Sequence, residues 1–539
     1  MHIVSVAQII ALEKQANQMG MDYETMMSNA GKALADVVKA RYSQENRKNV
    51  LGLVGGGNNG GDTIIALTHL AQLGWQVRAY LTKTRSPQER IMNAFINAGG
   101  VLTNMSEDQN FDKLKRWTRQ SDIILDGILG TGFKLPLKSE IHNLLTCVSS
   151  IRPNADIIAV DCPSGIDCDS GEVASACLKA DLTVCMAAVK QGLVKFPAFE
   201  LVGDLTTVSI GLPHSLSGWK DINGCVVDRE AVRIILPQRR IDGHKGTYGT
   251  CLVIAGSDRY CGAVRLCCEA AYRMGVGLVQ AAIPDCIYNA IAGSIPEAIW
   301  LPLPSKAGMI DMHAHQIIKT VLNRISVILV GPGLGLGEHT RQFLNILLMP
   351  LPDIDKNDTE DELPGQQGKL KTIMTALPKL VIDADGLKHL RSISGWHKKI
   401  PQGSVLTPHP GEMAILTDRS IDAIQSDRIQ AAVDFAAYCG HVVVLKGALT
   451  VIAKPNKQYS VVPFATDALA SAGTGDVLAG MIAGLMAQGV KGYDAAVSCV
   501  YLHAQAGMMA ANSLGSSRSV IASDVINFIP YVLKKNTGK

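Results

Sequence analysis

The 539-residue sequence has no unbroken apolar run of about 18 residues, the length that indicates a membrane-spanning helix. Its first residues show no charged leader followed by an apolar core, so we expect no secretory signal. No run of Lys or Arg is long enough to indicate a nucleic-acid or membrane surface, and the formal net charge is only +3. We therefore expect a cytoplasmic protein that binds neither nucleic acid nor a membrane.

The 13 cysteines lack the paired CxxC spacing that zinc and redox sites use. Their number is odd and they are scattered along the chain, for example at Cys147, Cys162 and Cys185. Such cysteines are typical of small buried thiols in a reducing compartment.

Length and composition favour two α/β domains. One hydrophobic core seldom holds 539 residues, and 47% hydrophobic residues with 51 glycines are typical of a compact enzyme with many loops. The regular patterning weakens between residues 211 and 241, where we place the domain boundary. The predicted domains are 1–215 and 225–539, and a helix is expected at Arg229–Ile235.

In the first half, strands alternate with helices, which predicts a mostly parallel sheet with helices on both faces. The expected strands are 50–54, 76–81, 122–125, 157–160 and 182–186. Ligands of such sheets bind beyond the carboxyl ends of the strands. The residues at those positions are 55–62, 126–133 and 161–165.

The glycine loop at 55–60 formally matches the dinucleotide fingerprint, but no acid follows the second strand as a Rossmann cofactor site requires. We interpret it as a site for a nucleotide-like ligand without hydride transfer. Asn59, Asp126 and Ser164 would offer hard oxygen ligands to a monovalent or divalent cation. The alternative is that Asp126 and Asp161 only cap their loops.

The second half also alternates strands with helices. The expected strands are 250–255, 277–283, 327–330, 380–382, 404–406 and 442–445. Gly, Asp, His and Lys again follow the strand ends. Residues 351–371 are predicted to form a polar loop without chemistry.

A glycine-rich turn, Ser471-Ala472-Gly473-Thr474-Gly475-Asp476, leads directly into an apolar helix. The backbone N–H groups of such a turn lack partners, and the helix dipole favours an anion there. Asp476 would then remove a proton from a hydroxyl while the turn receives a phosphoryl group. The alternative is that Asp476 is only an N-cap.

These motifs together resemble two enzyme families in a fixed order. The second half is similar to the ADP-dependent NAD(P)H-hydrate dehydratases, a ribokinase-like branch, at 244–246, 255–257, 331–335, 383–385, 407–412, 445–447 and 472–476. The first half is similar to the NAD(P)H-hydrate epimerases at 30–31, 57–62, 126, 130–132, 160–165 and 190–193. The resemblance covers nearly the whole chain and implies a Rossmann-like epimerase domain fused to a ribokinase-like dehydratase domain.

The resemblance implies repair of hydrated NADH and NADPH, whose added hydroxyl lies next to the ring nitrogen. The dehydratase would phosphorylate this hydroxyl from ADP and expel phosphate, which yields NAD(P)H, AMP and phosphate. The epimerase would interconvert the R and S hydrates so that both can be repaired. The implied cofactors are ADP as co-substrate, Mg²⁺ with the nucleotide and K⁺ in the epimerase domain, and we expect a homo-oligomer.

For the dehydratase, the resemblance implies Asp476 as the base, with Asp385 and Glu412 as magnesium or water contacts. The substrate-binding residues would be Ala263, Gly333, Gly335, His409 and Asp476. The nucleotide-binding residues would be Lys446, Gly447, Ala448, Leu449, Thr450, Gly473, Thr474 and Gly475. The alternatives are a surface lysine at Lys446 and a loop histidine between two prolines at His409.

For the epimerase, Asp161 would move a proton at the hydroxyl, with Lys190 as an electrostatic helper. Asn59, Asp126 and Ser164 would hold the potassium ion. The substrate-binding residues would be Asn58, Asn59, Gly60, Gly61, Asp62, Gly130, Thr131, Gly132, Phe133, Lys134, Leu135, Pro136 and Asp161. The alternative for Lys190 is an ordinary exposed lysine.

The chain departs from the family pattern at Ser28, at Thr63 and at residues 465–469. One rival reading remains open, an ATP-dependent kinase of a small alcohol fused to a non-catalytic nucleotide-binding Rossmann-like module. The sequence also leaves open ADP versus ATP and NADH hydrate versus NADPH hydrate.

Overall fold

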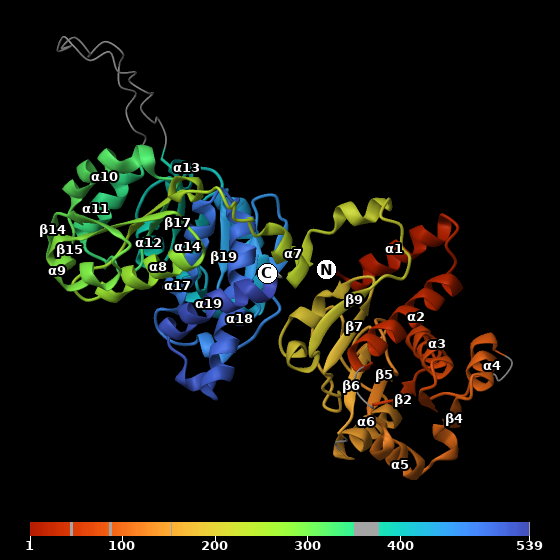
Figure 1. The fold of residues 1–539 in the computed structure, drawn as a ribbon. Coiled ribbons are helices and arrows are strands. Elements are labelled where there is room, and N and C mark those ends of the chain that lie inside the picture. The colour runs from red at the N-terminus through yellow and green to blue at the C-terminus, as the bar shows by residue number, and fades with distance from the viewer. Residues whose placement is uncertain (44–46, 86–88, 152–153, 350–376, 538–539) are drawn as a thin grey trace, which may run out of the picture. The chain divides into compact units, whose positions relative to one another are not determined.

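The computed structural model describes residues 1–43, 47–85, 89–151, 154–349 and 377–537 (Figure 1). They form two compact units, Met1–Val226 and Val227–Lys539. The predicted polar loop at 351–371 lies outside the described residues. Within them, no helix is long and apolar enough to cross a membrane.

The first unit contains a seven-stranded sheet in which all pairings are parallel. Its strands, in spatial order, are β4 (Val101–Asn104), β3 (Gln76–Leu81), β2 (Asn49–Val54), β5 (Ile123–Gly127), β6 (Asp156–Val160), β7 (Leu182–Met186) and β9 (Asp204–Val208). Because the strands are parallel, their carboxyl ends meet at one edge of the sheet. This edge brings together the loops that follow β2, β5 and β6.

Both faces of this sheet are covered by helices. Val50 and Val54 of β2 pack in the core beneath α2 (Tyr23–Tyr42) and α3 (Asn58–Gln72). Leu51 and Leu53, which point to the opposite face, pack with α5 (Asp112–Gln120) and α6 (Ser139–Ile151). Strands buried on both faces are apolar at every position, which explains the continuous apolar run of β2.

A further set of short strands in this unit was not predicted. The sequence prediction placed the first strand at 50–54, but β1 (His2–Val4) precedes it. It pairs in parallel with β8 (Val189–Lys190) and antiparallel with β10 (Gly224–Val226). Strands of two or three residues are too short to show a recognisable alternation of apolar and polar residues.

The second unit is built around a mostly parallel sheet. Its strands, in spatial order, are β13 (Ile299–Leu303), β12 (Leu278–Pro284), β11 (Thr250–Ile254), β16 (Val327–Val330), β17 (Lys379–Ile382), β18 (Val405–Leu406), β19 (Val442–Leu445), β20 (Val451–Ala453) and β21 (Tyr459–Val461). β20 pairs antiparallel with both β19 and β21, and sequence analysis predicted neither strand. The α/β fold class predicted for both halves is confirmed.

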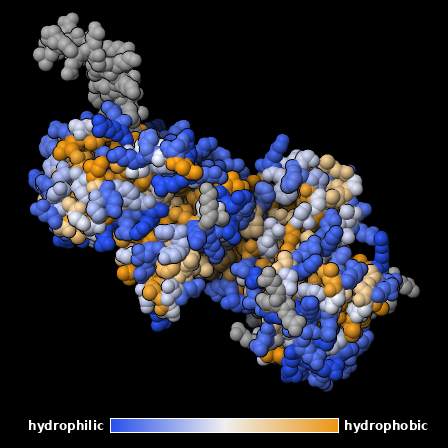
Figure 2. Space-filling model, in the orientation of Figure 1, coloured by the Kyte–Doolittle hydropathy of each residue, from blue (hydrophilic) through white to orange (hydrophobic). Residues whose placement is uncertain are grey.

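Helices also cover both faces of this sheet. Val253 of β11 lies in a core with α8 (Cys261–Arg273), α17 (Thr474–Ala487), α18 (Gly492–Leu514) and α19 (Ala522–Thr537). Leu252 and Ile254 point the other way and are equally buried. On the face of the molecule seen in Figure 2, hydrophobic residues are scattered among hydrophilic ones, as expected when the large apolar side chains fill the cores.

Close packing against α8 positions α17. A side chain added at Gly480 would come within 2.3 Å of the Cys267 carbonyl oxygen, and one at Gly484 within 2.6 Å of the Ala271 carbonyl oxygen. The two glycines therefore let α17 lie directly against α8. This contact holds the amino end of α17, with Asp476 in its first turn, in place.

Candidate functional site

In the second unit, polar and charged side chains follow the carboxyl ends of neighbouring strands. Asp383 follows β17, Thr407 follows β18 and Lys446 follows β19. The Lys446 Nζ donates to Asp383 Oδ1 at 2.7 Å and lies 3.8 Å from Glu412 Oε2. Thr407 Oγ1 donates to the same oxygen of Asp383 at 2.8 Å. The structure thus joins groups that are 63 residues apart in the chain.

Lys446 is not a surface lysine, because only 17% of its side chain is exposed. Burial disfavours its charged form, but the carboxylates of Asp383 and Glu412 outweigh burial and raise the pKa of Lys446. The ammonium therefore stays charged. Its backbone N–H also donates to the Pro408 carbonyl at 2.9 Å, which ties the end of β19 to the neighbouring loop.

The glycine-rich turn before α17 has the geometry of an anion site. Gly473 is the N-cap, in a left-handed conformation with φ 87°. Among the described residues, no acceptor is found for the backbone N–H groups of Gly475 and Asp476. The Lys446 Nζ lies 3.5 Å from the position that a Cβ on Gly475 would occupy. Unpaired N–H groups and an ammonium thus meet where a phosphoryl group would bind.

Asp476 is the third residue of α17, and the N-cap position belongs to Gly473. Its carboxyl is partly buried near other carboxylates. Burial, together with the charge of Asp383, raises the pKa of Asp476 to about 7, although Lys446 opposes the shift. A carboxyl with a pKa near neutrality suits a general base that works at neutral pH.

His409 caps the amino end of α14 (Pro410–Thr417). Its Nδ1 accepts hydrogen bonds from the N–H groups of Gly411 at 3.0 Å and Glu412 at 3.3 Å. The buried Glu412 carboxylate accepts from the His409 N–H at 2.9 Å. His409 is therefore the N-cap of a helix, and 53% of its side chain remains exposed.

The glycine loop after β16 lies beside α8 and α12 (Asp385–Leu390). A side chain added at Gly333 would come within 3.1 Å of the Ala263 Cβ, so these two predicted substrate-binding residues are neighbours. The Gly335 N–H donates to Asp385 Oδ2 at 3.0 Å. Asp385 also accepts from Lys388 Nζ at 3.0 Å, so both of its oxygens have partners.

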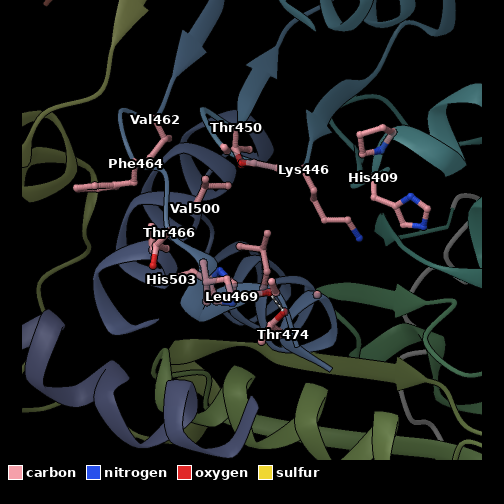
Figure 3. Close-up of a pocket in the computed structure, with 17 residues that line it drawn as sticks. His409, Lys446, Thr450, Val462, Phe464, Thr466, Leu469, Thr474, Val500 and His503 are labelled. Carbon is pink, nitrogen blue, oxygen red and sulfur yellow. Dashed lines mark hydrogen bonds between the residues drawn. The ribbon is translucent and has the colours of Figure 1, made fainter. Parts of the chain in front are cut away.

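A cavity of about 430 Å³ opens beside Lys446 and the glycine-rich turn (Figure 3). Lys446 and His409 lie on one side of it, and Val462, Phe464, Thr466, Leu469 and His503 lie on the other. Its lining comprises His409, Pro410, Lys446, Gly447, Ala448, Thr450, Val462, Phe464, Thr466, Leu469, Ala470, Thr474, Gly475, Leu478, Val500, His503 and Ala504. Among the predicted nucleotide contacts, Leu449, which is buried, and Gly473 are outside this lining, as is the predicted base Asp476.

Sequence analysis missed His503, Asp383 as the partner of Lys446, and the apolar wall of the cavity. Asp383 belonged to a recognised motif, so its position at a strand end was a usable signal. His503 lies in the middle of α18 among apolar residues, where nothing in the local sequence distinguishes it from a core histidine.

In the first unit, Asp161 directly follows β6 and adopts a left-handed conformation with φ 67°. Its Oδ1 accepts the Met186 N–H at 2.8 Å and a hydrogen bond from Lys190 Nζ. Only 1% of the Lys190 side chain is exposed, so the reading of Lys190 as an exposed lysine is wrong. Burial disfavours the Lys190 ammonium, but the Asp161 charge outweighs burial and raises its pKa.

Two further carboxyls lie near this ion pair. Asp62 occupies the first turns of α3, where burial and then the charges of Asp161 and Glu13 raise its pKa well above the usual value. Glu13 of α1 (Val6–Gln18), which sequence analysis missed, also has a raised pKa because of burial. One lysine thus faces three carboxyls.

The predicted cation ligands Asn59, Asp126 and Ser164 lie together. The Ser164 hydroxyl donates to Asp126 Oδ1 at 2.5 Å, and the Ser164 N–H donates to Oδ2 at 2.8 Å. Asn59 Nδ2 donates to the carbonyl oxygens of Leu129 at 2.8 Å and Val160 at 2.6 Å. Asp126 is completely buried, and burial raises its pKa although the two hydrogen bonds from Ser164 lower it.

The loop after β5 lies beside the start of α3. A side chain at Gly130 would come within 3.0 Å of the Asn59 side chain, and the Phe133 N–H donates to the Gly130 carbonyl at 3.1 Å. Lys134 Nζ lies 2.9 Å from Asp167 Oδ2. Of the predicted epimerase substrate contacts, residues 58–62, 130–136 and 161 thus all belong to loops or helix starts at this edge of the sheet.

Comparison with known proteins identifies relatives of both halves of the chain. Residues 251–530 match the family model described as NAD(P)H-hydrate dehydratase, and residues 23–192 match the one described as YjeF-related protein N-terminus. The chain is 32% identical over 548 residues to the bifunctional NAD(P)H-hydrate repair enzyme Nnr of Moorella thermoacetica, covering 99% of this chain and 97% of that protein. The corresponding enzyme of Coxiella burnetii is 31% identical, with 96% of each chain covered.

Among solved structures, the ADP/ATP-dependent NAD(P)H-hydrate dehydratase of Bacillus subtilis, co-crystallised with ATP/Mg²⁺, is 28% identical. The match covers 58% of this chain and 98% of that chain, with a TM-score of 0.46. The two matched domains occur in the predicted order, and the relatives are similar over nearly their whole length. Both findings indicate the same family. The chain belongs to the family of bifunctional NAD(P)H-hydrate repair enzymes, which combine an NAD(P)H-hydrate epimerase with an NAD(P)H-hydrate dehydratase.

Proposed function

We propose that residues 225–539 form the dehydratase domain, with Asp476 as its base, and residues 1–215 the epimerase domain, with Asp161 at its centre. The first assignment rests on the position of Asp476, whose pKa is raised to about 7, beside the Lys446 ammonium. Two backbone N–H groups of the same turn also have no acceptor within the described part of the chain. A base and an anion site side by side suit phosphoryl transfer to a hydroxyl.

Asp476 takes the proton from the hydroxyl of the hydrate, and the hydroxyl oxygen forms a bond to the β-phosphorus of ADP as the bond to AMP breaks. Electrons of the ring nitrogen then expel phosphate, and a proton leaves the neighbouring carbon to restore the dihydronicotinamide. Lys446 and the N–H groups of the turn stabilise the charge on the transferred group. His409, at the cavity rim, would orient the hydrate.

Mg²⁺ would enter with the nucleotide. Among the described residues, no group of three His, Cys, Asp or Glu side chains could hold a metal ion by itself. A cation bound mainly through phosphate oxygens and water agrees with this arrangement. Asp385 and Glu412 are the proposed water contacts. A homo-oligomeric state and a cytoplasmic location stay predictions.

The proposed function is tested by incubating the full chain with hydrated NADH and either ADP or ATP. We expect absorbance of the regenerated dihydronicotinamide to rise in step with release of AMP and phosphate when ADP is used. The rival kinase reading predicts instead a stable phosphorylated alcohol from ATP and no activity on the hydrates. That second pattern would overturn our assignment.

We also propose that Asn59, Asp126 and Ser164 hold K⁺ in the epimerase domain. The supporting observation is that the fully buried Asp126 carboxyl contacts a hydroxyl and backbone N–H groups but, among the described residues, no basic side chain. A bound cation would stabilise the charged form of this buried carboxyl, and its oxygen neighbours suit a hard cation. The ion would supply this charge and hold the loops after β5 and β6 in place.

We therefore expect epimerisation to depend on K⁺ and to fall at least about tenfold when Asp126 is replaced with Asn, the scale of a lost buried charge contact. The measurement follows the two hydrates by chromatography in buffers with KCl or choline chloride. Asp169→Asn, a carboxylate on the same unit that contacts the Val6 N–H, is the control. Equal rates in both salts, with the wild-type chain, would contradict the potassium site.

A further inference from the structure

One buried nitrogen in the wall of the cavity beside Lys446 has no hydrogen-bond partner among the residues that the structure describes. His503 of α18 lines the cavity and is only 6% exposed. Its Nε2 finds no hydrogen-bond partner among the described residues and is shielded from solvent. A buried polar atom left unpaired costs about 1–3 kcal/mol, so such atoms are rare unless a ligand completes them.

The surroundings of His503 decide which role Nε2 can take. A hydrogen bond with the Thr474 backbone favours a protonated ring nitrogen, and because Nε2 has no partner we assign this proton to Nδ1. Burial lowers the pKa of His503 to about 4, and the charge of Lys446 acts in the same direction, so the ring is neutral at pH 7. In this tautomer Nε2 is a hydrogen-bond acceptor.

The position of His503 indicates which part of a nucleotide it meets. Lys446 and the anion turn mark the phosphate end of the cavity, and Figure 3 shows His503 on the side opposite Lys446, next to Leu469 and Thr474. Val462, Phe464 and Val500 line the same side. Apolar walls with one convergent polar atom are typical of a pocket for a flat heterocyclic base.

We propose that Nε2 of His503 accepts a hydrogen bond from the exocyclic amino group of the adenine base and thereby selects adenine nucleotides. The inference rests on the nucleotide occupying the cavity as proposed above. A pocket that hydrogen-bonds a substrate N–H rejects an analogue lacking it, because its own polar atom is then left unpaired. His503 is thus a specificity residue and takes no part in the transfer of the phosphoryl group.

The test compares ADP with purine riboside 5′-diphosphate, which carries hydrogen in place of the amino group, by calorimetric binding to the full chain. The wild-type chain should bind ADP at least about tenfold more tightly than the analogue, the scale of one buried hydrogen bond. His503→Leu should weaken ADP binding by about the same factor and leave the analogue nearly unchanged. His503→Gln, which offers an amide oxygen, should recover part of the preference.

Val500→Ala is the matched control, because it alters the same wall of the cavity without touching a polar atom. This change should weaken the binding of ADP and of the analogue by the same factor. If His503→Leu also weakens both equally in a folded protein, His503 is only structural and the inference is wrong. If His503→Leu instead removes a preference for ADP over 2′-deoxy-ADP, the partner of Nε2 is the ribose hydroxyl, and the inference is equally wrong. Failure of the wild-type chain to bind ADP would overturn the proposed nucleotide site itself.

Discussion

Replacement of Asp476 with Asn should lower the turnover of hydrate dehydration by at least about 100-fold, the usual scale for loss of a general base. Nucleotide binding should change little, because Lys446 and the unpaired N–H groups of the turn remain. Asn also preserves the shape of the side chain and the start of α17. The measurement is the rate of NADH regeneration from the S hydrate at saturating ADP, together with calorimetric binding of ADP.

The pH dependence gives this prediction a second readout. Asp476 must be deprotonated to accept the hydroxyl proton, and burial with the nearby Asp383 raises its pKa to about 7. The ratio kcat/KM should therefore increase as the pH rises through about 7 and level off above it. The residual rate of the Asp476→Asn chain should lack this rise.

Asp494→Asn is the matched control, because Asp494 is the third residue of α18 just as Asp476 is the third residue of α17. If Asp476 acted only through the helix dipole, the two changes would have similarly small effects, worth about 0.3–1 kcal/mol each. If a folded Asp476→Asn chain dehydrates the hydrate at nearly the wild-type rate, the proposed mechanism is wrong.

Replacement of Asp161 with Asn should abolish most epimerisation while dehydration of the favoured epimer proceeds at the wild-type rate. We expect at least about a 100-fold fall in epimerisation, because the proton at the hydroxyl loses its carrier. Repair should then stall once the favoured epimer is exhausted, apart from slow spontaneous interconversion. Chromatography of both epimers over time shows the pattern directly.

This change also leaves the buried Lys190 ammonium without its carboxylate partner, which destabilises a fold. The double variant Asp161→Asn/Lys190→Met removes both charges and serves as the control for stability. If it is folded and still epimerises at the wild-type rate, Asp161 has no catalytic role. If Asp161→Asn instead abolishes dehydration in a folded chain, the two chemistries share a site and the assignment of one site to each domain is wrong.

Some elements of the fold could be predicted from the sequence and others could not. Strands with apolar residues on both faces, such as β2 and β19, and the glycine-rich turns after them could be predicted because each signal lies within a few consecutive residues. The helix predicted at Arg229–Ile235 coincides with α7 for the same reason. The two-residue and three-residue strands β8, β1 and β20 were missed because they are too short for any periodic signal.

The sequence by itself determined the α/β class, the two sets of motifs and the identity of Asp476, Lys446 and Asp161, since each follows a predicted strand or opens a predicted helix. Only the tertiary structure decided which groups surround these residues. The pairing of Lys446 with Asp383, the burial of Lys190 against Asp161 and the unpaired nitrogen of His503 depend on chain segments far apart in the sequence. Burial and the distance between charges set a pKa, and neither is encoded by the neighbours of a residue along the chain.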